Sequence, residues 1–180
     1  MRALQALQRR LALMAARAVL RALNDGWKTQ RLQVELLAGE LMDGVERFQD
    51  YGLTSVPHAG AEPVVLSLGG DRAHAVAIVV HDKRYRLTGL AEGEVALYDD
   101  LGQKVHLTRA GIVIDGGGLP VTIQNTSLVT VDGDLAVTGT LDVTGAADFS
   151  GQVRHNGTRI DTTHRHSGVQ SGTNNTGTVI

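Results

Sequence analysis

The chain has 180 residues and a mass of 19.1 kDa, enough for one ordinary domain or for a small domain with an elongated appendage. Its 17 basic and 19 acidic side chains give a formal net charge of −2, so it lacks the basic footprint of a nucleic-acid binder. The absence of cysteine excludes disulfides, thiolate nucleophiles and the common structural zinc sites, and any metal must use histidine or oxygen ligands.

The first 24 residues are rich in Ala, Leu, Arg and Gln, which favour helices. Apolar side chains recur there at spacings of three and four, at Leu4, Leu7, Leu11, Met14 and Ala18. We therefore predict an amphipathic helical segment over 1–26, which either packs on its own domain or docks on another subunit. Arg17 interrupts the apolar run that a secretory signal needs, so we expect no cleaved signal, and no apolar run is long enough to predict a membrane-spanning helix.

Residues 27–110 change to short runs with period-two alternation and β-branched side chains, separated by Gly, Asp and Pro. This pattern predicts a small antiparallel barrel or sandwich. The acidic residues Asp71, Asp99 and Asp100 stand where hairpins must reverse, so we interpret them as turn residues and not as catalytic carboxylates. The expected strands are 30–36, 45–51, 63–68, 73–80, 84–87, 95–98 and 104–108.

Residues 111–162 carry a six-residue repeat in which glycine recurs and the second and fourth positions after each glycine tend to be apolar. Each unit predicts a short strand with one buried face, closed by a glycine turn. One chain has too few of these units to cover its own apolar face. We therefore predict that three copies bury this face together in a homotrimeric β-helical shaft. The repeat glycines are Gly133, Gly139, Gly145, Gly151 and Gly157.

Residues 163–180 contain His164-Arg165-His166, in which both imidazoles lie on one face of an extended strand. Such a pair is often ordinary surface histidine, but three chains on one axis would bring six nitrogens together and satisfy an octahedral metal. Fe(II), Ni(II) or Mn(II) fits such a set, and iron is the most available, so we predict one iron ion, Fe2+, per trimer, lost as the pH falls below the histidine pKa of about 6.5. His155 takes an inward position of the last repeat, where a structural role is expected more than ligation.

Several of these segments, in this order, resemble the Mu-type phage baseplate spike family. They are residues 90–98 (LAEGEVALY), residues 100–107 (DLGQKVHL), the Gly-Thr/Val repeats, residues 164–170 (HRHSGVQ) and residues 175–177 (NTG). The resemblance implies a mainly β trimer with an N-terminal segment, an OB-type β-barrel over 27–110, an intertwined β-helical needle and a tip that binds iron through His164 and His166. Arg165 stands where the family often has Thr.

The resemblance also implies a location and partners. The implied location is the virion, where the needle lies at the centre of a contractile tail baseplate. The implied partners are a baseplate hub protein and the host outer membrane, which the needle pierces. We expect the basic N-terminal segment to contact the hub. We expect no catalysis, because the sequence contains no nucleophile elbow, phosphate loop or acid/base pair. We expect no nucleic-acid partner, because the net charge is slightly negative and few aromatic residues are available for stacking.

Other functions fit the sequence less well. A hexapeptide acyltransferase would need more repeats, with an aliphatic residue before each small one, and a metal-dependent hydrolase would need a larger barrel with further ligands. The remaining alternative is an OB-type glycan-binding module of a tail-derived secretion or toxin device, for which Tyr51 and Tyr85 would be the residues to test.

Overall fold

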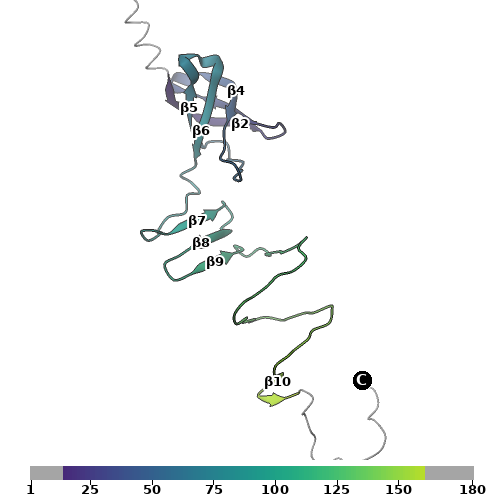
Figure 1. The fold of residues 1–180 in the computed structure, drawn as a ribbon. Helices are drawn as coiled ribbons and strands as arrows, with labels where there is room; N and C mark the ends of the chain where they lie inside the picture. Colours follow the sequence, from purple (N-terminus) through teal and green to yellow (C-terminus); the bar gives the residue numbers. More distant parts are fainter. Residues whose placement is uncertain (1–13, 161–180) are drawn as a thin grey trace, which may run out of the picture. The chain divides into compact units, whose positions relative to one another are not determined.

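The computed structural model describes residues 14–160, which are almost entirely strand, turn and extended chain (Figure 1). The chain divides into two compact units between Ile123 and Gln124. A mainly β fold was predicted and is confirmed. The first unit contains a six-stranded sheet made of β1 (Ala15–Arg17), β2 (Val19–Asn24), β3 (Gln30–Glu35), β4 (Leu41–Arg47), β5 (Glu62–Ser67) and β6 (Ala75–His81).

The six-stranded sheet runs in the order β1-β5-β6-β4-β3-β2 and curls back on itself. Its two end strands, β1 and β2, are one stretch of chain interrupted at Ala18, so the same stretch faces β5 on one side and β3 on the other. Backbone hydrogen bonds complete this closure, from Ala18 N to Pro63 O at 3.0 Å and from Leu20 N to Ala61 O at 2.8 Å. Bulges in the β2–β3, β3–β4 and β5–β6 pairs supply the bending that a closed sheet requires.

One pair of neighbours departs from the antiparallel arrangement that the sequence predicts. Strands β4 and β6 pair in parallel, through Glu46 opposite Val76 and Arg47 opposite Ala77. The cause is the long connection between β4 and β5, which carries the chain to the position beside β1 before β6 returns antiparallel to β5. Because β6 returns next to β4 after two reversals, these two strands run in the same direction.

The core of the closed sheet is small and aliphatic. Strands β3 and β5 alternate between buried and partly exposed positions, which is the period of a sheet with one face inside. Small alanines at the closely packed positions let the sheet curl tightly around the larger side chains. The buried cluster consists of Ala18, Leu20, Leu32, Val34, Val45, Ala61, Val65, Ala75 and Ala77.

The predicted N-terminal helix is wrong for the described part of that segment, because residues 15–17 and 19–24 are strands. Helix-favouring composition is overridden by pairing: Ala15 stands opposite Leu66, and Leu20 stands opposite Val34. Ala18 and Leu20 are buried in the core of the closed sheet, so tertiary contacts determine their conformation. Residues 1–13 lie outside the described residues.

Three single-turn 3-10 helices connect these strands: η1 (Leu37–Gly39), η2 (Leu68–Gly70) and η3 (Arg72–His74). Asp71 begins η3, and its side chain accepts a hydrogen bond from Ala73 N at 2.9 Å, which confirms its predicted turn role. The predicted strand at 84–87 is wrong. There, Asp82 binds both the backbone N–H and the guanidinium of Arg84, which holds the chain in a turn.

A three-stranded meander follows, made of β7 (Val95–Tyr98), β8 (Lys104–Leu107) and β9 (Ile112–Asp115) (Figure 1). The predicted strands at 95–98 and 104–108 are confirmed, and β9 was not predicted. Asp99 accepts hydrogen bonds from Leu101 N at 3.0 Å and Gln103 N at 2.8 Å, so it forms the β7–β8 turn as expected.

In the second unit, the only strands within the described residues are β10 (Arg154–His155) and β11 (Thr158–Arg159). They form a two-residue hairpin around Asn156 and Gly157, which have φ values of +46° and +81°. Positive φ at both central residues is the geometry of a type I′ turn, for which Asn-Gly is the preferred sequence. The last repeat therefore ends in a hairpin, and His155 lies exposed on it.

Candidate assembly surface

The two faces of the meander have different chemistry. In an antiparallel pair, directly opposite residues lie on the same face, and alternate residues of one strand lie on opposite faces. The pairing of Leu97 with Val105 and of Val105 with Ile114 therefore places three aliphatic side chains in a row across one face. We call this side the aliphatic face; its members are Val95, Leu97, Val105, Leu107, Ile112 and Ile114.

The described residues leave the aliphatic face uncovered. Its side chains range from 37% exposed at Val105 to 71% exposed at Ile112. Six adjoining aliphatic side chains in water are unfavourable, at roughly 25 cal/mol for each Å2 left unburied. A contiguous apolar patch of this kind marks an interaction site.

The opposite face of the meander carries its charged groups. Lys104 Nζ lies 2.8 Å from Asp115 Oδ2 on the neighbouring strand, and His106 Nε2 lies 3.2 Å from Glu94 Oε2. The backbone N–H groups of Ala91 and Arg109 bind the Glu94 carboxylate and lower its pKa. The Lys104 ammonium in the same way lowers the pKa of Asp115. These polar pairs suit a face that is turned to solvent. The aliphatic face is therefore the side of the meander that we expect a partner to cover.

The apolar repeat positions continue this uncovered character beyond the meander. Every described residue from 117 to 152 is exposed. No strand is formed between β9 and β10, although the repeats predict strands there. A strand needs a neighbour to satisfy its backbone groups, and a single chain supplies none in this segment. The exposed aliphatic and aromatic side chains at the repeat positions are Leu135, Val137, Leu141, Val143 and Phe149.

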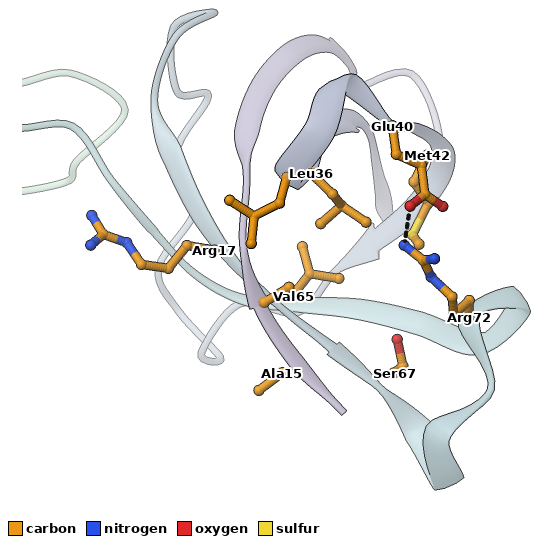
Figure 2. Close-up of a pocket in the computed structure, with 10 residues that line it drawn as sticks. Ala15, Arg17, Leu36, Glu40, Met42, Val65, Ser67 and Arg72 are labelled. Carbon is orange, nitrogen blue, oxygen red and sulfur yellow. Dashed lines mark ion pairs between the residues drawn. The ribbon is translucent and has the colours of Figure 1, made fainter. Parts of the chain in front are cut away.

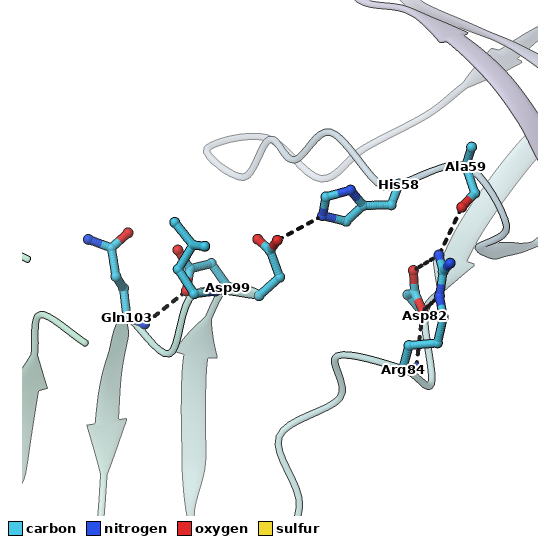
Figure 3. A network of polar contacts seen from close by, with 8 residues as sticks. His58, Ala59, Asp82, Arg84, Asp99 and Gln103 are labelled. Carbon is cyan, nitrogen blue, oxygen red and sulfur yellow. Dashed lines mark hydrogen bonds and ion pairs between the residues drawn. The ribbon is translucent and has the colours of Figure 1, made fainter. Parts of the chain in front are cut away.

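A polar joint connects the closed sheet to the meander (Figure 3). His58 Nε2 lies 3.0 Å from Asp100 Oδ2 in the β7–β8 turn, and the His58 ring lies 4.9 Å from the ring of Tyr85. Arg84 donates to Ala59 O at 2.9 Å and to both oxygens of Asp82. The hydrogen bonds from Arg84 lower the pKa of Asp82 to about 2. Arg84 and Tyr85, which follow β6, therefore contact residues 58 and 59, and Asp100 of the meander contacts the same His58.

The closed sheet has an apolar hollow of about 500 Å3 between β1 and the start of η1 (Figure 2). Leu36, Met42 and Val65 supply its apolar lining, and the ion pair of Glu40 with Arg72, at 2.7 Å, lies at its rim. Among the described strands, β1 pairs with β5 alone, so no described strand covers the other edge of β1 here. Ser67 also lines this hollow, and no histidine does among its described lining residues.

The predicted metal ligands His164 and His166 lie outside the described residues, so the tip stays a prediction. Within residues 14–160, no group of three His, Cys, Asp or Glu side chains is arranged to hold a metal ion. In the same part of the chain, no helix is long and apolar enough to cross a bilayer.

Comparison with known proteins confirms the resemblance to the Mu-type spike. Residues 17–84 match the family model described as "Bacteriophage Mu Gp45, N-terminal". The chain is 47% identical over 110 residues to the "Baseplate puncturing device gp45" of Escherichia phage Mu, covering 61% of this chain and 56% of that protein. It is also 47% identical over 108 residues to the "Mu-like prophage FluMu protein gp45" of Haemophilus influenzae (strain Rd), covering 60% of this chain and 59% of the relative. In both cases the match spans less than two thirds of the relative's own length.

Proposed function

We propose that this chain, similar to the phage Mu baseplate puncturing device, forms a homotrimeric needle that pierces the host outer membrane. The relatives support a structural role in a phage baseplate and a location in the virion tail. A baseplate protein associates with other baseplate components, and a hub protein is the partner that we propose.

The aliphatic face is the observation that carries the proposal. Residues 14–160 of one chain leave six aliphatic side chains of the meander uncovered, together with the apolar repeat positions that follow. Three copies that turn these side chains toward a common axis would bury them and would also give each repeat strand a neighbour. Such a rod resists bending because its backbone groups are paired between chains.

We assign the closed sheet to an OB-type barrel. Counting β1 and β2 as one strand, the ring contains five strands, and its third and fifth strands, β4 and β6, are the parallel pair. We propose that the first unit is the part of the chain that contacts a hub protein.

We propose that the tip is closed by one iron ion, with His164 and His166 of each chain as ligands. Neutral imidazole is a common ligand of first-row transition metals, and a metal at the end of the needle would join the three chain ends. His155 provides a matched control, because it lies exposed on β10 and is not part of the predicted ligand set.

Elemental analysis of untagged protein tests the tip. We expect one metal per three chains in wild type and in His155→Ala, and none in the double variant His164→Ala/His166→Ala. Equal metal content in all three proteins would contradict the assignment of the ligands without affecting the proposed trimer.

A further inference from the structure

The closed sheet carries a second hollow of about 520 Å3, whose lining shares no residue with the aliphatic face. It lies where the β2–β3 turn meets the end of β4. Asp25, Trp27 and Lys28 line it from the turn, and Arg47 and Phe48 line it from β4 and the residue after it. Its lining is therefore rich in charged and aromatic groups.

Two aromatic side chains lie exposed at this hollow. Trp27 is 62% exposed and Phe48 is 56% exposed, although the whole chain has only six aromatic residues. The guanidinium of Arg31 lies 4.8 Å from the Trp27 ring centroid and lines the neighbouring hollow, not this one. Arg31 therefore covers one indole face and leaves the other for a ligand. Aromatic rings of this kind pack on the apolar faces of other rings.

Arg47 is a half-buried cation whose described hydrogen-bond partners are all neutral. Its Nη1 donates to Gln30 Oε1 at 2.9 Å and to Ser55 O at 2.6 Å, and its Nη2 donates to Ser55 Oγ at 2.8 Å. These three bonds use both Nη1 hydrogens and one Nη2 hydrogen. The Nε hydrogen and the second Nη2 hydrogen donate no bond within the described residues, and together they form the side-on fork that matches a carboxylate.

The fork of Arg47 is held in place before any ligand arrives. Gln30 is buried, and its Nε2 donates to Asp25 Oδ1 at 2.6 Å and to Ser55 O at 2.9 Å. Gln30 and Ser55, which are hydrogen-bonded to each other, thus hold the guanidinium on the side away from the free Nε–Nη2 edge. Preorganisation of this kind lowers the entropy cost of binding. Lys28 adds a second cation to the lining, against the single carboxylate of Asp25.

We propose that this hollow binds a saccharide that carries a carboxylate. The carboxylate lies on the Nε–Nη2 fork of Arg47, the sugar ring packs on Trp27 and Phe48, and its hydroxyls bind the ammonium of Lys28 and the amide of Gln49. The proposal does not depend on the needle, because none of these residues belongs to the aliphatic face or to the predicted metal ligands.

Trp27 provides the readout, since it is the only tryptophan in the chain. The 180-residue chain is titrated with galacturonate, glucuronate and N-acetylneuraminate while indole fluorescence is recorded. Galactose and glucose serve as the uncharged counterparts of the two uronates, and acetate serves as a simple anion. We expect a saturable change with at least one acidic sugar, and binding of its uncharged counterpart weaker by about tenfold or more, because a charge-assisted bidentate contact is lost.

Variants separate the two parts of the site. Arg47→Lys keeps the charge but removes the fork, and Phe48→Ala removes an exposed ring whose loss leaves the core intact; each should weaken binding about tenfold. Tyr51→Ala is the matched control, because Tyr51 is fully exposed and does not line the hollow, and it should bind like wild type.

Three results would overturn the proposal. They are no fluorescence change with any acidic sugar at tens of millimolar, an equal response to galactose and galacturonate, or an equal response to acetate alone. The first would assign the exposed aromatic residues to a protein contact instead. A normal response in Phe48→Ala and Arg47→Lys would overturn the assigned residues.

Discussion

Val105 and Ile114 lie directly opposite each other on β8 and β9, and both side chains are exposed on the aliphatic face. Val113, one residue earlier on β9, lies on the opposite face beside His106. In the proposed trimer, Ile114 would therefore be buried between chains, whereas the adjacent Val113 would stay on the face turned to solvent.

Replacement of Ile114 by Asp should prevent assembly. In a trimer the change would bury three carboxylates together, and buried unpaired charges are strongly unfavourable. We expect light scattering after size exclusion to give the mass of a single chain for Ile114→Asp.

Val113→Asp is the matched control for that experiment. It introduces the same charge on the same strand, on the face that already carries Lys104 and Asp115. We expect it to keep the mass of wild type. Equal behaviour of the two variants would contradict the assignment of the aliphatic face as the buried one.

Gly117 should be far less tolerant of substitution than its neighbour Gly118. Both have positive φ, +60° and +85°, so alanine at either costs about 1 kcal/mol in backbone strain. A Cβ at Gly117 would also lie 2.8 Å from the carbonyl oxygen of Leu101, whereas a Cβ at Gly118 meets nothing within 4 Å. We expect denaturant unfolding to show a loss of about 2–4 kcal/mol for Gly117→Ala and about 1 kcal/mol for Gly118→Ala.

Gln30→Ala should destabilise the closed sheet by about 1–3 kcal/mol, because it leaves a half-buried Arg47 with one acceptor fewer and removes the bond to Asp25. Gln33, on the same strand, is the control, and Gln33→Ala should change the free energy of unfolding by less than about 0.5 kcal/mol. Urea titration of both variants checks this, and equal losses would show that the Gln30 hydrogen bonds do not stabilise the fold.

Asp82→Asn should lower the melting temperature at neutral pH, because it replaces the carboxylate that binds Arg84. The pKa of Asp82 is lowered to about 2 from an ordinary value of 3.8, so its contribution is fully present above about pH 4 and is lost as the pH falls through 2. We expect a difference of about 2–4 °C between variant and wild type at pH 7 that disappears near pH 2. A difference that persists at pH 2 would assign the effect to packing, not to charge.

The sequence predicted the local elements of the sheets better than their connections. Alternation along Gln30–Glu35 and Glu62–Ser67 locates β3 and β5 within one residue, since one face of each strand is buried. The helix predicted for the N-terminal segment was wrong over its described residues. Ala, Leu and Arg favour a helix locally, but pairing with β5 and β3 makes this stretch two strands. Strand β9 was missed because Ile112–Asp115 is uniformly apolar until its last residue and shows no alternation.

The candidate surface was partly visible in advance. The six-residue repeat predicted that one chain could not cover its own apolar positions, and the exposure of residues 117–152 agrees with that. The aliphatic face was not predicted, because it depends on the registers of β7, β8 and β9, which no spacing in the sequence reveals. The hollow at Trp27 and Arg47 joins residues of the β2–β3 turn with residues at the end of β4, so it likewise could be found only from the fold.

Sedimentation equilibrium of the untagged 180-residue chain tests the central claim most directly, because it measures mass without reference to shape. Three chains of 19.1 kDa predict about 57 kDa, unchanged across a wide range of protein concentration. A mass of 19.1 kDa at all concentrations would contradict the account, because the aliphatic face and the repeat positions would then be exposed in the working protein.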